Sequence, residues 1–401
     1  ALMSLPVFAV GGLKDPAEAE AILVDGKADM VAMTREQIAD PEFANKAREG
    51  REDEIYHCIR GNQGCIARVW RGMPISCTVN PAAGREGRLG SDTLTPAASP
   101  GRWLVVGGGP AGMKAAETLA RRGHAVTLLE REAELGGQVN LILETPGRDP
   151  FAWITRDLTA QMERLGVDVQ LGVEATPDLI ATNAPDGVIV ATGALPSRTG
   201  YSSSTPHVPT LAGVEQDNVV TVWDVLLGTA PVGDNVVVLD DEGTRMSAGV
   251  AEVLLGQGKS VEVVSTYNAL FPATAQTLEL PILYSRLFEK GLAHRLNSWA
   301  KIIDGDAVDV FNLYSGATER LEGVDTVVLL TRPLANDTLF FELKGTHGGL
   351  HRIGDCVAPR KLDHAIYEGY LAGLERWDPE ERYIIEGELE RWPAEPEPAN
   401  A

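Results

Sequence analysis

The sequence predicts an α/β protein with two modules of dinucleotide-binding design. The first observation is a strand, glycine-rich turn, helix and strand between Arg102 and Glu130. The second is a similar unit that starts with NVVVLDDEG at residues 235–243. The third is that short apolar runs alternate with helical segments through most of the chain, which indicates parallel strands joined by crossover helices. Together these features predict two Rossmann-like nucleotide-binding modules.

Composition sets limits on size and partners. The chain has 401 residues, of which 44% are hydrophobic and 23% charged, and this length suffices for two or three domains. Its 57 acidic against 35 basic residues give a net charge of −22, which argues against nucleic acid and anionic membranes as partners. No apolar run approaches the roughly 18 residues of a membrane-spanning helix, and the N-terminus lacks the basic region of a signal peptide. The cytoplasm is the expected location.

The N-terminal segment reads as a strand–helix–strand unit. Residues 5–12 and 28–33 are predicted to be buried strands paired in parallel. The helix between them should begin with Asp15 as its N-cap and Pro16 at its first position. Another helix is expected over residues 36–50.

Boundaries follow from changes in composition. The expected parts are 1–50, a cysteine-containing loop and linker at 51–100, a nucleotide-binding domain at 101–230 plus 335–385, a second module at 231–334, and a disordered tail at 386–401. Further strands are predicted at 168–172, 187–193, 260–265, 324–331 and 351–356, and further helices at 247–257 and 362–373.

The glycine-rich turn carries the strongest chemical signal. Gly107 would permit the tight turn, Gly109 the approach of a pyrophosphate, and Gly112 the close packing of helix on strand. Pro110 and Ala111 open the helix, whose unpaired N–H groups would face the phosphates. Glu130 ends the second strand, where an acid accepts hydrogen bonds from ribose hydroxyls. The alternative is a glycine-rich turn without a ligand.

Other segments fit the same ligand. Gly137 and Gln138 lie just beyond Glu130 and Arg131, where the chain could fold over a cofactor. Thr192 and Gly193 close an apolar strand. Taken alone, each segment is more typical of an ordinary turn.

A last segment of this kind lies near the C-terminus. Gly354 and Asp355 precede the helical segment that contains Ala365, and Asp355 could bond a ribityl hydroxyl. The alternative for this segment is a plain helix cap.

The second module lacks the residues of a nicotinamide site. Its turn reads Leu239-Asp240-Asp241-Glu242-Gly243-Thr244, so three acids stand where a pyrophosphate would approach. Like-charge repulsion and the missing glycines oppose NAD(P)H binding there. We therefore predict a retained fold with a degenerate nucleotide site.

Three cysteines lie close together in the sequence. Cys58, Cys65 and Cys77 could hold an iron–sulfur cluster, although a complete [4Fe–4S] site usually has four cysteines. Zinc with three cysteines and a neighbour such as His57 is a second possibility, and three unligated thiols a third. No acid–base pair stands out, so the catalytic residues stay unassigned.

The combined motifs resemble the trimethylamine dehydrogenase group, which includes histamine dehydrogenase, N-methylproline demethylase and, more distantly, 2,4-dienoyl-CoA reductase. The matching segments are VGGLKDPAEAE, ADMVAMTREQIADPEF, CIRGNQGC with PISCTVNPAAGRE, VVGGGPAGMKAAETLARRGHAVTLLE, LGGQVN, VIVATG and IGDCVAPRKLDHAIYEGY. The resemblance implies an FMN-binding (β/α)8 barrel, a [4Fe–4S] cysteine loop and two nucleotide-binding modules. Electrons would pass from substrate to FMN to the cluster, and in the amine dehydrogenases onward to an electron-transferring flavoprotein.

Some positions depart from that pattern. Residues 1–50 resemble only the last two units of the barrel, so FMN is expected only where a complete barrel is supplied. Gly12 stands where the family has an arginine for the FMN phosphate, whereas Arg35 matches a phosphate-binding position. Gly61 replaces one cluster cysteine, which leaves three ligands.

Two functions are consistent with these features. The first is an FAD-dependent oxidoreductase or electron-transfer subunit, with FAD or ADP in the first module and a barrel-type flavin subunit as partner. The second is a non-catalytic nucleotide-binding or assembly module. An oligomer is expected in either case, and the chain could also be a fragment of a longer enzyme that starts inside its barrel.

Overall fold

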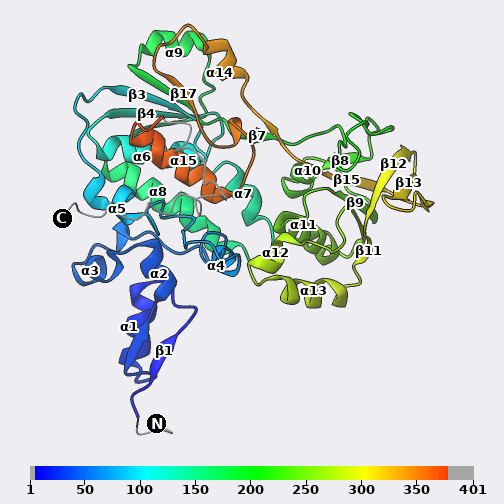
Figure 1. Cartoon of the computed structure of the whole chain (residues 1–401), viewed down its shortest axis with the longest axis horizontal. Helices are drawn as coiled ribbons and strands as arrows, with labels where there is room; N and C mark the ends of the chain where they lie inside the picture. The colour runs from blue at the N-terminus through cyan, green and yellow to red at the C-terminus, as the bar shows by residue number, and fades with distance from the viewer. Residues whose placement is uncertain (1–4, 378–401) are drawn as a thin grey trace, which may run out of the picture.

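The computed structural model describes residues 5–377, and it contains two five-stranded parallel sheets (Figure 1). The predicted α/β class with two Rossmann-like sheets is confirmed. The first sheet has the order β17-β6-β3-β4-β5. Its strands are β3 (Arg102–Val106), β4 (Ala125–Glu130), β5 (Asp168–Leu171), β6 (Gly187–Val190) and β17 (Leu350–Arg352).

Both faces of the first sheet are covered by helices. On β3, Trp103 and Val105 point into one core cluster, while Leu104 and Val106 point into another, as the two-residue period of a strand requires. In Figure 1 the first face carries one group of helices and the opposite face another. The first group is α6 (Pro110–Arg121), α8 (Ala152–Arg164) and α15 (Leu362–Gly373), and the second is α9 (Pro177–Asn183) and α14 (Thr338–Leu343).

The second sheet has the order β11-β10-β9-β15-β8. Its strands are β8 (Val219–Thr221), β9 (Asn235–Asp240), β10 (Ser260–Ser265), β11 (Ala293–Arg295) and β15 (Thr326–Leu330). Helices pack on one face: α10 (Val222–Leu226), α11 (Arg245–Gly256), α12 (Ala273–Gln276) and α13 (Leu280–Glu289). The other face packs on an antiparallel sheet of β12 (Ser298–Asp304), β13 (Ala307–Asn312) and β14 (Thr318–Glu322), which the sequence analysis did not predict.

The second module is inserted into the first. The chain leaves the first sheet through β7 (Ala194–Leu195) and returns through β16 (Leu334–Ala335), and these two strands pair antiparallel. The short helix α7 (Gln138–Leu143) lies beside the crossing point (Figure 1). The first domain therefore consists of two segments that are far apart in the sequence.

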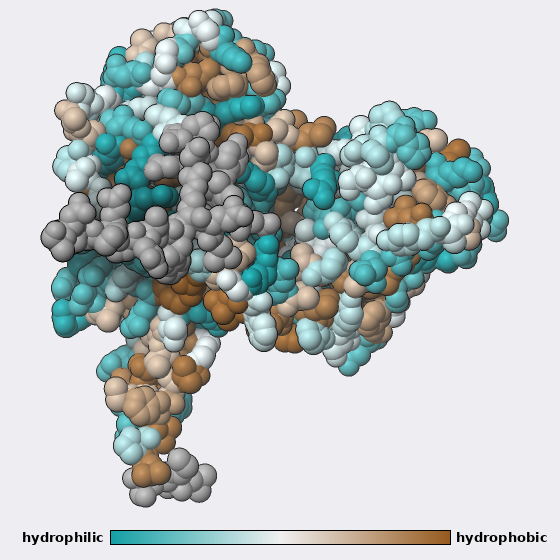
Figure 2. Space-filling view, in the orientation of Figure 1, coloured by the Kyte–Doolittle hydropathy of each residue, from teal (hydrophilic) through white to brown (hydrophobic). Residues whose placement is uncertain are grey.

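The N-terminal unit forms as predicted but is not buried. β1 (Phe8–Val10) and β2 (Met30–Ala32) pair in parallel on either side of α1 (Pro16–Val24), and the Asp15 side chain accepts a hydrogen bond of 2.7 Å from the Glu18 amide. The prediction of buried strands is wrong, because Phe8 is 57% exposed and Val10 70% exposed. Within the described residues each strand pairs only with the other, so their apolar faces stay open (Figure 2).

Two other predicted elements are divided. The single helix expected at 36–50 is two helices, α2 (Thr34–Ala39) and α3 (Phe43–Arg48), because Pro41 forces Asp40 into an extended conformation. The strand expected at 351–356 is β17 followed by the 3₁₀ turn η4 (Gly354–Cys356).

The cysteine segment is loop-rich, as predicted. It contains only short helices, which are η1 (Glu52–Glu54), α4 (Ile66–Trp70), α5 (Glu86–Leu89) and η2 (Ser91–Thr93). A further 3₁₀ turn, η3 (Asp149–Phe151), precedes α8. Among the residues 5–377, none of the helices combines the length and the apolar character needed to cross a bilayer. The tail predicted to be disordered, 386–401, lies outside the described residues.

Candidate nucleotide-binding site

A cavity of about 980 Å³ lies at the carboxyl ends of the strands of the first sheet. It brings together most of the residues that the sequence singled out. Those that line it are Gly107, Gly109, Pro110, Ala111, Glu130, Arg131, Gly137, Gln138, Thr192, Gly193, Asp355 and Ala365. This edge of an α/β sheet is where ligands bind in folds of this class.

The glycine turn shapes one wall of the cavity. Gly107 has a φ of +110°, and a Cβ there would lie 2.3 Å from the Ala191 carbonyl oxygen. A Cβ on Gly112 would lie 2.0 Å from the Gly107 oxygen, so Gly112 serves packing and does not line the cavity. A Cβ on Gly109 would meet no atom within 4 Å, which leaves open space for a ligand at this point.

The start of helix α6 faces this open space. Gly109 is its N-cap and provides no side-chain cap, and Pro110 occupies the first helical position. The N–H groups of the first turn therefore keep hydrogen-bonding capacity for an anion, and the helix dipole favours negative charge there.

Glu130 lies at the end of β4 with only 7% of its surface exposed. One of its carboxylate oxygens accepts a hydrogen bond of 2.6 Å from the Gly108 amide, and the other accepts one of 2.8 Å from the Glu132 amide. Each oxygen has a second lone pair, so the carboxylate can also accept hydrogen bonds from hydroxyls of a ribose.

Two further turns close over the glycine turn. The Gly136 amide donates to the Gly108 carbonyl at 2.9 Å, and Gly137, at a φ of +53°, lies so close that its Cβ would be 3.2 Å from the Gly109 Cα. The Thr192 hydroxyl donates to the Asn336 carbonyl at 2.5 Å. This bond fixes the loop after β6 to the returning chain.

Asp355 provides a half-buried acid on the opposite wall. Its carboxylate accepts hydrogen bonds of 3.0 Å from the Gln138 amide and from the Arg360 backbone N–H. Burial raises the pKa of Asp355 above its usual range. Gly354 lies behind the wall, because a Cβ there would come within 2.8 Å of the Ala111 Cβ.

The far end of the cavity comprises residues that the sequence analysis missed. Leu141 and Ile142 of α7 line it, together with Trp223 and Leu227 of the second module. No motif marks these positions, because their role depends on the docking of α10 near the first domain. They make this end of the cavity apolar.

The cysteine segment does not provide a metal-binding geometry. Among residues 5–377, no group of three or more His, Cys, Asp or Glu side chains is arranged to hold a metal ion. Burial raises the pKa of the Cys58 thiol, and raises that of Cys77 to about 12. The position of Gly61 is tight, since a Cβ there would lie 3.1 Å from the Phe151 ring. A cluster on Cys58, Cys65 and Cys77 stays a prediction.

Arg35 lies apart from the nucleotide cavity. Its guanidinium donates a hydrogen bond of 2.9 Å to Asn62, in the cysteine segment. Gly12 has no side chain to offer, and its carbonyl accepts a hydrogen bond from the Arg60 guanidinium. The role of Arg35 toward an FMN phosphate stays a prediction.

A buried charge network joins the cysteine segment to α6. Glu117 is 1% exposed, lies 2.9 Å from the Lys114 ammonium, and also pairs with Arg121. The Tyr56 hydroxyl donates to Glu117 at 2.9 Å. The two cations lower the pKa of Glu117 to about 2 despite its burial.

The acidic turn of the second module accepts hydrogen bonds from other groups of the protein. The Asp241 carboxylate accepts hydrogen bonds from the Ser202 hydroxyl at 2.9 Å, the Ser203 amide at 3.0 Å and the Thr266 hydroxyl at 2.9 Å. Asp240 is fully buried and accepts from the Gly243 amide at 2.9 Å. The loop at 202–203 therefore lies across the edge where a second dinucleotide would bind.

Comparison with known proteins places this fold in a family. Models of three families match: NADH:flavin oxidoreductase / NADH oxidase at residues 1–54, an NAD(P)-binding Rossmann-like domain at 105–151, and an OYE-like second alpha/beta domain at 220–328. The chain is 33% identical over 400 residues to a metal reductase of Desulforamulus reducens, covering 92% of this chain and 57% of that protein. It is also 33% identical over 407 residues to N,N-dimethylglycine/sarcosine dehydrogenase of Chromohalobacter salexigens, with the same coverage of 92% and 57%.

A solved structure supports the same family assignment. The 6-hydroxypseudooxynicotine amine oxidase of Pseudomonas geniculata N1 superposes with a TM-score of 0.88 at 32% identity, over 94% of this chain and 57% of that one. The chain thus spans little more than half the length of the relatives that it matches. It belongs to the NADH:flavin oxidoreductase family, where it corresponds to the C-terminal region of the amine dehydrogenase and demethylase type, with residues 1–54 matching the barrel domain.

Proposed function

We propose that this chain binds FAD in the 980 Å³ cavity and forms the nucleotide-binding, electron-transferring part of a flavin-dependent oxidoreductase of the amine dehydrogenase and demethylase type. One observation carries the proposal. A single cavity touches the glycine turn, Glu130, the 137–138 turn and Asp355. Bound FAD would supply electron transfer in steps of one or two electrons.

The size and polarity of the cavity favour FAD over ADP. Glu130 and the α6 N-terminus suit the ribose and phosphates that both ligands share. Beyond them the cavity continues to Leu141 and Trp223. An ADP molecule has no apolar group that could fill this end of the cavity. At about 980 Å³ the cavity lies at the upper end of the range for ligand sites. The isoalloxazine ring of FAD would bury this apolar end.

Nicotinamide is not the proposed electron source. Asp241 already binds Ser202, Ser203 and Thr266, and its charge opposes a pyrophosphate at the same place. We infer that the second module stabilises the structure of the first domain and does not bind NAD(P)H. Flavin-loaded protein mixed with NADH should therefore keep its oxidised flavin spectrum under anaerobic conditions, and rapid bleaching would contradict this inference.

A flavin barrel is the proposed partner. The open apolar faces of β1 and β2 support it, because Phe8, Val10 and Met30 are 57%, 70% and 53% exposed. Exposed apolar faces of this kind commonly mark protein–protein interfaces. FMN would bind only in a completed barrel. The proposed electron path does not include the three cysteines. Iron and sulfide analysis of anaerobically purified protein tests whether they hold a cluster.

The decisive experiment introduces a negative charge at the phosphate position. Gly109→Asp adds a carboxylate at a position whose Cβ would meet no atom within 4 Å, so the fold should tolerate it. We expect the purified wild type to release FAD on heating, identified by chromatography, and the variant to release none. Gly87→Asp is the matched control, because its Cβ also meets no atom within 4 Å and it lies outside the cavity. Release of ADP alone from the wild type would contradict the assignment of FAD.

A second candidate is a nucleotide-binding module without redox function. The tight position of Gly61 against Phe151 favours it, because no cysteine ligand stands there. An anaerobic redox titration separates the two candidates. A flavin that is reduced and reoxidised reversibly supports the first, and a protein with no reducible centre supports the second.

A further inference from the structure

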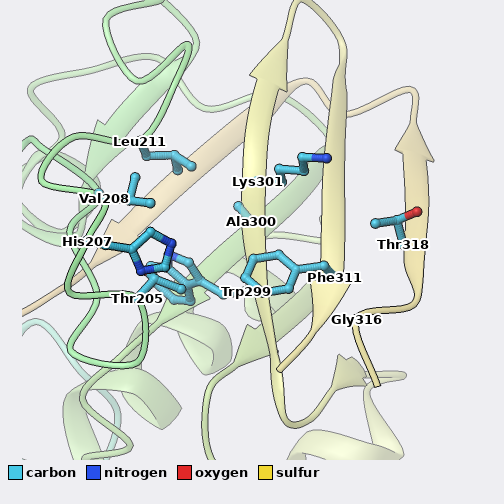
Figure 3. Close-up of a pocket in the computed structure, with 11 residues that line it drawn as sticks. Thr205, His207, Val208, Leu211, Trp299, Ala300, Lys301, Phe311, Gly316 and Thr318 are labelled. Atoms are coloured by element: carbon cyan, nitrogen blue, oxygen red, sulfur yellow. The ribbon is translucent and has the colours of Figure 1, made fainter. Parts of the chain in front are cut away.

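A second cavity, of about 330 Å³, lies within the second module (Figure 3). One side is the loop at 200–211, which contributes Thr205, His207 and Val208. The other side is the antiparallel sheet of β12, β13 and β14. None of its lining residues belongs to the nucleotide cavity.

Aromatic rings form the inner part of this cavity. Trp299 is 1% exposed, and Phe311 is its cross-strand partner on β13. In Figure 3 the Phe311 side chain points from β13 back toward the loop that carries His207. Flat apolar walls of this kind favour a planar ring. An engineered apolar cavity of about 150 Å³ binds benzene, so 330 Å³ suffices for two fused rings.

A β-bulge adds a cation to the strand side. Ala300 pairs with Val310 and Ile302 with Asp309, so the register passes over Lys301. Lys301 therefore has no residue opposite it, and in Figure 3 its side chain extends over β13 toward the side where Thr318 lies. Bulges commonly redirect one side chain in this way beside binding sites.

Three acids of this sheet form ion pairs with arginines and not with Lys301. Asp304 and Asp309 both pair with Arg320, at 2.8 and 3.0 Å, and Glu319 pairs with Arg295. Within the described part of the chain, no hydrogen bond or ion pair engages the Lys301 ammonium. Lys301 is therefore an exposed cation at the rim of the aromatic pocket, unpaired among residues 5–377.

We propose that this cavity binds a small aromatic carboxylate of about two fused rings. The ring lies against Phe311, with His207 on the loop side, and the buried Trp299 closes the floor beneath it. The carboxylate meets the Lys301 ammonium at the strand side. The site is independent of the nucleotide cavity and of the function proposed for it.

Calorimetric titration of the full chain with indole-3-carboxylate tests the proposal. The neutral amide, indole-3-carboxamide, has the same shape and serves as the charge control. We expect one saturable site for the carboxylate, with the amide binding about tenfold more weakly. The same affinity is expected with and without saturating FAD, whereas competition with FAD would place the ligand in the other cavity and overturn the proposal.

Three variants locate the site. Lys301→Met keeps the stem and removes the charge, and should weaken carboxylate binding about tenfold without changing the affinity for the amide. Lys290→Met, at the exposed C-cap position that follows α13 and outside the cavity, is the matched control and should bind normally. Val208→Trp should fill the cavity and abolish binding of both compounds. Absence of saturable binding to the wild type, or equal carboxylate affinity in Lys301→Met, would overturn the proposal.

Discussion

The Gln138 side-chain amide donates a hydrogen bond of 3.0 Å to the Asp355 carboxylate, across 217 positions of sequence. Gln138 begins α7 and Asp355 lies in η4, after the chain has returned from the second module. Their contact closes the wall of the nucleotide cavity from two segments that a local motif search treats separately.

Replacing Asp355 by Asn should weaken nucleotide binding. The variant keeps the size of the side chain but loses the charge that would accept a hydrogen bond from a cofactor hydroxyl. We expect FAD affinity to fall about tenfold, since hydrogen bonds to charged groups contribute about 1.5 kcal/mol or more. Calorimetric titration of nucleotide-free protein measures it. Asp168→Asn, outside the cavity on β5, is the control, and an unchanged affinity in Asp355→Asn would refute the role of Asp355.

Replacing Glu117 by Gln should destabilise the fold. The change leaves Lys114 and Arg121 without their shared carboxylate at a buried position, which costs about 3 kcal/mol or more. Urea unfolding followed by circular dichroism measures this free energy. Glu163→Gln, on the nearby helix α8, is a matched control, and equal stability of wild type and Glu117→Gln would contradict the network.

The Glu117 contribution should also depend on pH in a defined direction. Its pKa in the folded protein is about 2, below the usual value of 4.5, so the folded state favours the charged form. Its stabilising effect is fully present above pH 4.5 and is lost as the pH falls toward 2. The unfolding free energies of wild type and Glu117→Gln should therefore converge in acid, and a constant difference would argue against this linkage.

Glu242 should show the opposite dependence. Burial and the nearby Asp240 raise its pKa to about 7 from 4.5, so the folded state favours the protonated form. The fold loses stability as the pH rises through this window, and the loss is complete above pH 7. Glu242→Gln should stabilise the protein by on the order of 1 kcal/mol at pH 8 and have no effect in acid. Thermal unfolding at several pH values decides whether this sign is right.

Replacing Asp241 by Ala should release the loop at 202–203. The variant removes the acceptor of the Ser202, Ser203 and Thr266 hydrogen bonds. Leaving the buried Ser202 hydroxyl without this acceptor costs about 1–3 kcal/mol. Hydrogen–deuterium exchange should rise in residues 200–206 and stay unchanged in β3 and α6. Asp217→Ala, at an exposed position, is the control. Unchanged exchange in Asp241→Ala would show that the loop is held by other contacts.

The sequence was sufficient for the features that depend on local patterns. The glycine turn, Glu130 at the end of β4 and the helix at 362–373 lie where their spacing predicts. The wall formed by Trp223 and Leu227 could not be predicted, because it depends on how an inserted module docks. The exposure of Phe8 and Val10 could not be predicted either, since an apolar run indicates a strand but not its neighbours. The antiparallel sheet was missed because its strands mix buried and exposed residues irregularly, as the bulge at Lys301 illustrates.

The pairing of β7 with β16 affects how the chain can be shortened and in which order its domains can fold during synthesis. Ala194 lies opposite Ala335 and Leu195 opposite Leu334, so residues 196–333 leave and re-enter at one point. This segment is a cassette, and a tight turn in its place would join the two halves of the first domain. During synthesis β17 and α15 emerge only after the whole cassette, so the first sheet cannot be completed until the second module is out of the ribosome. The first domain, although its chain begins earlier, can therefore complete its fold only after the second module has been synthesised.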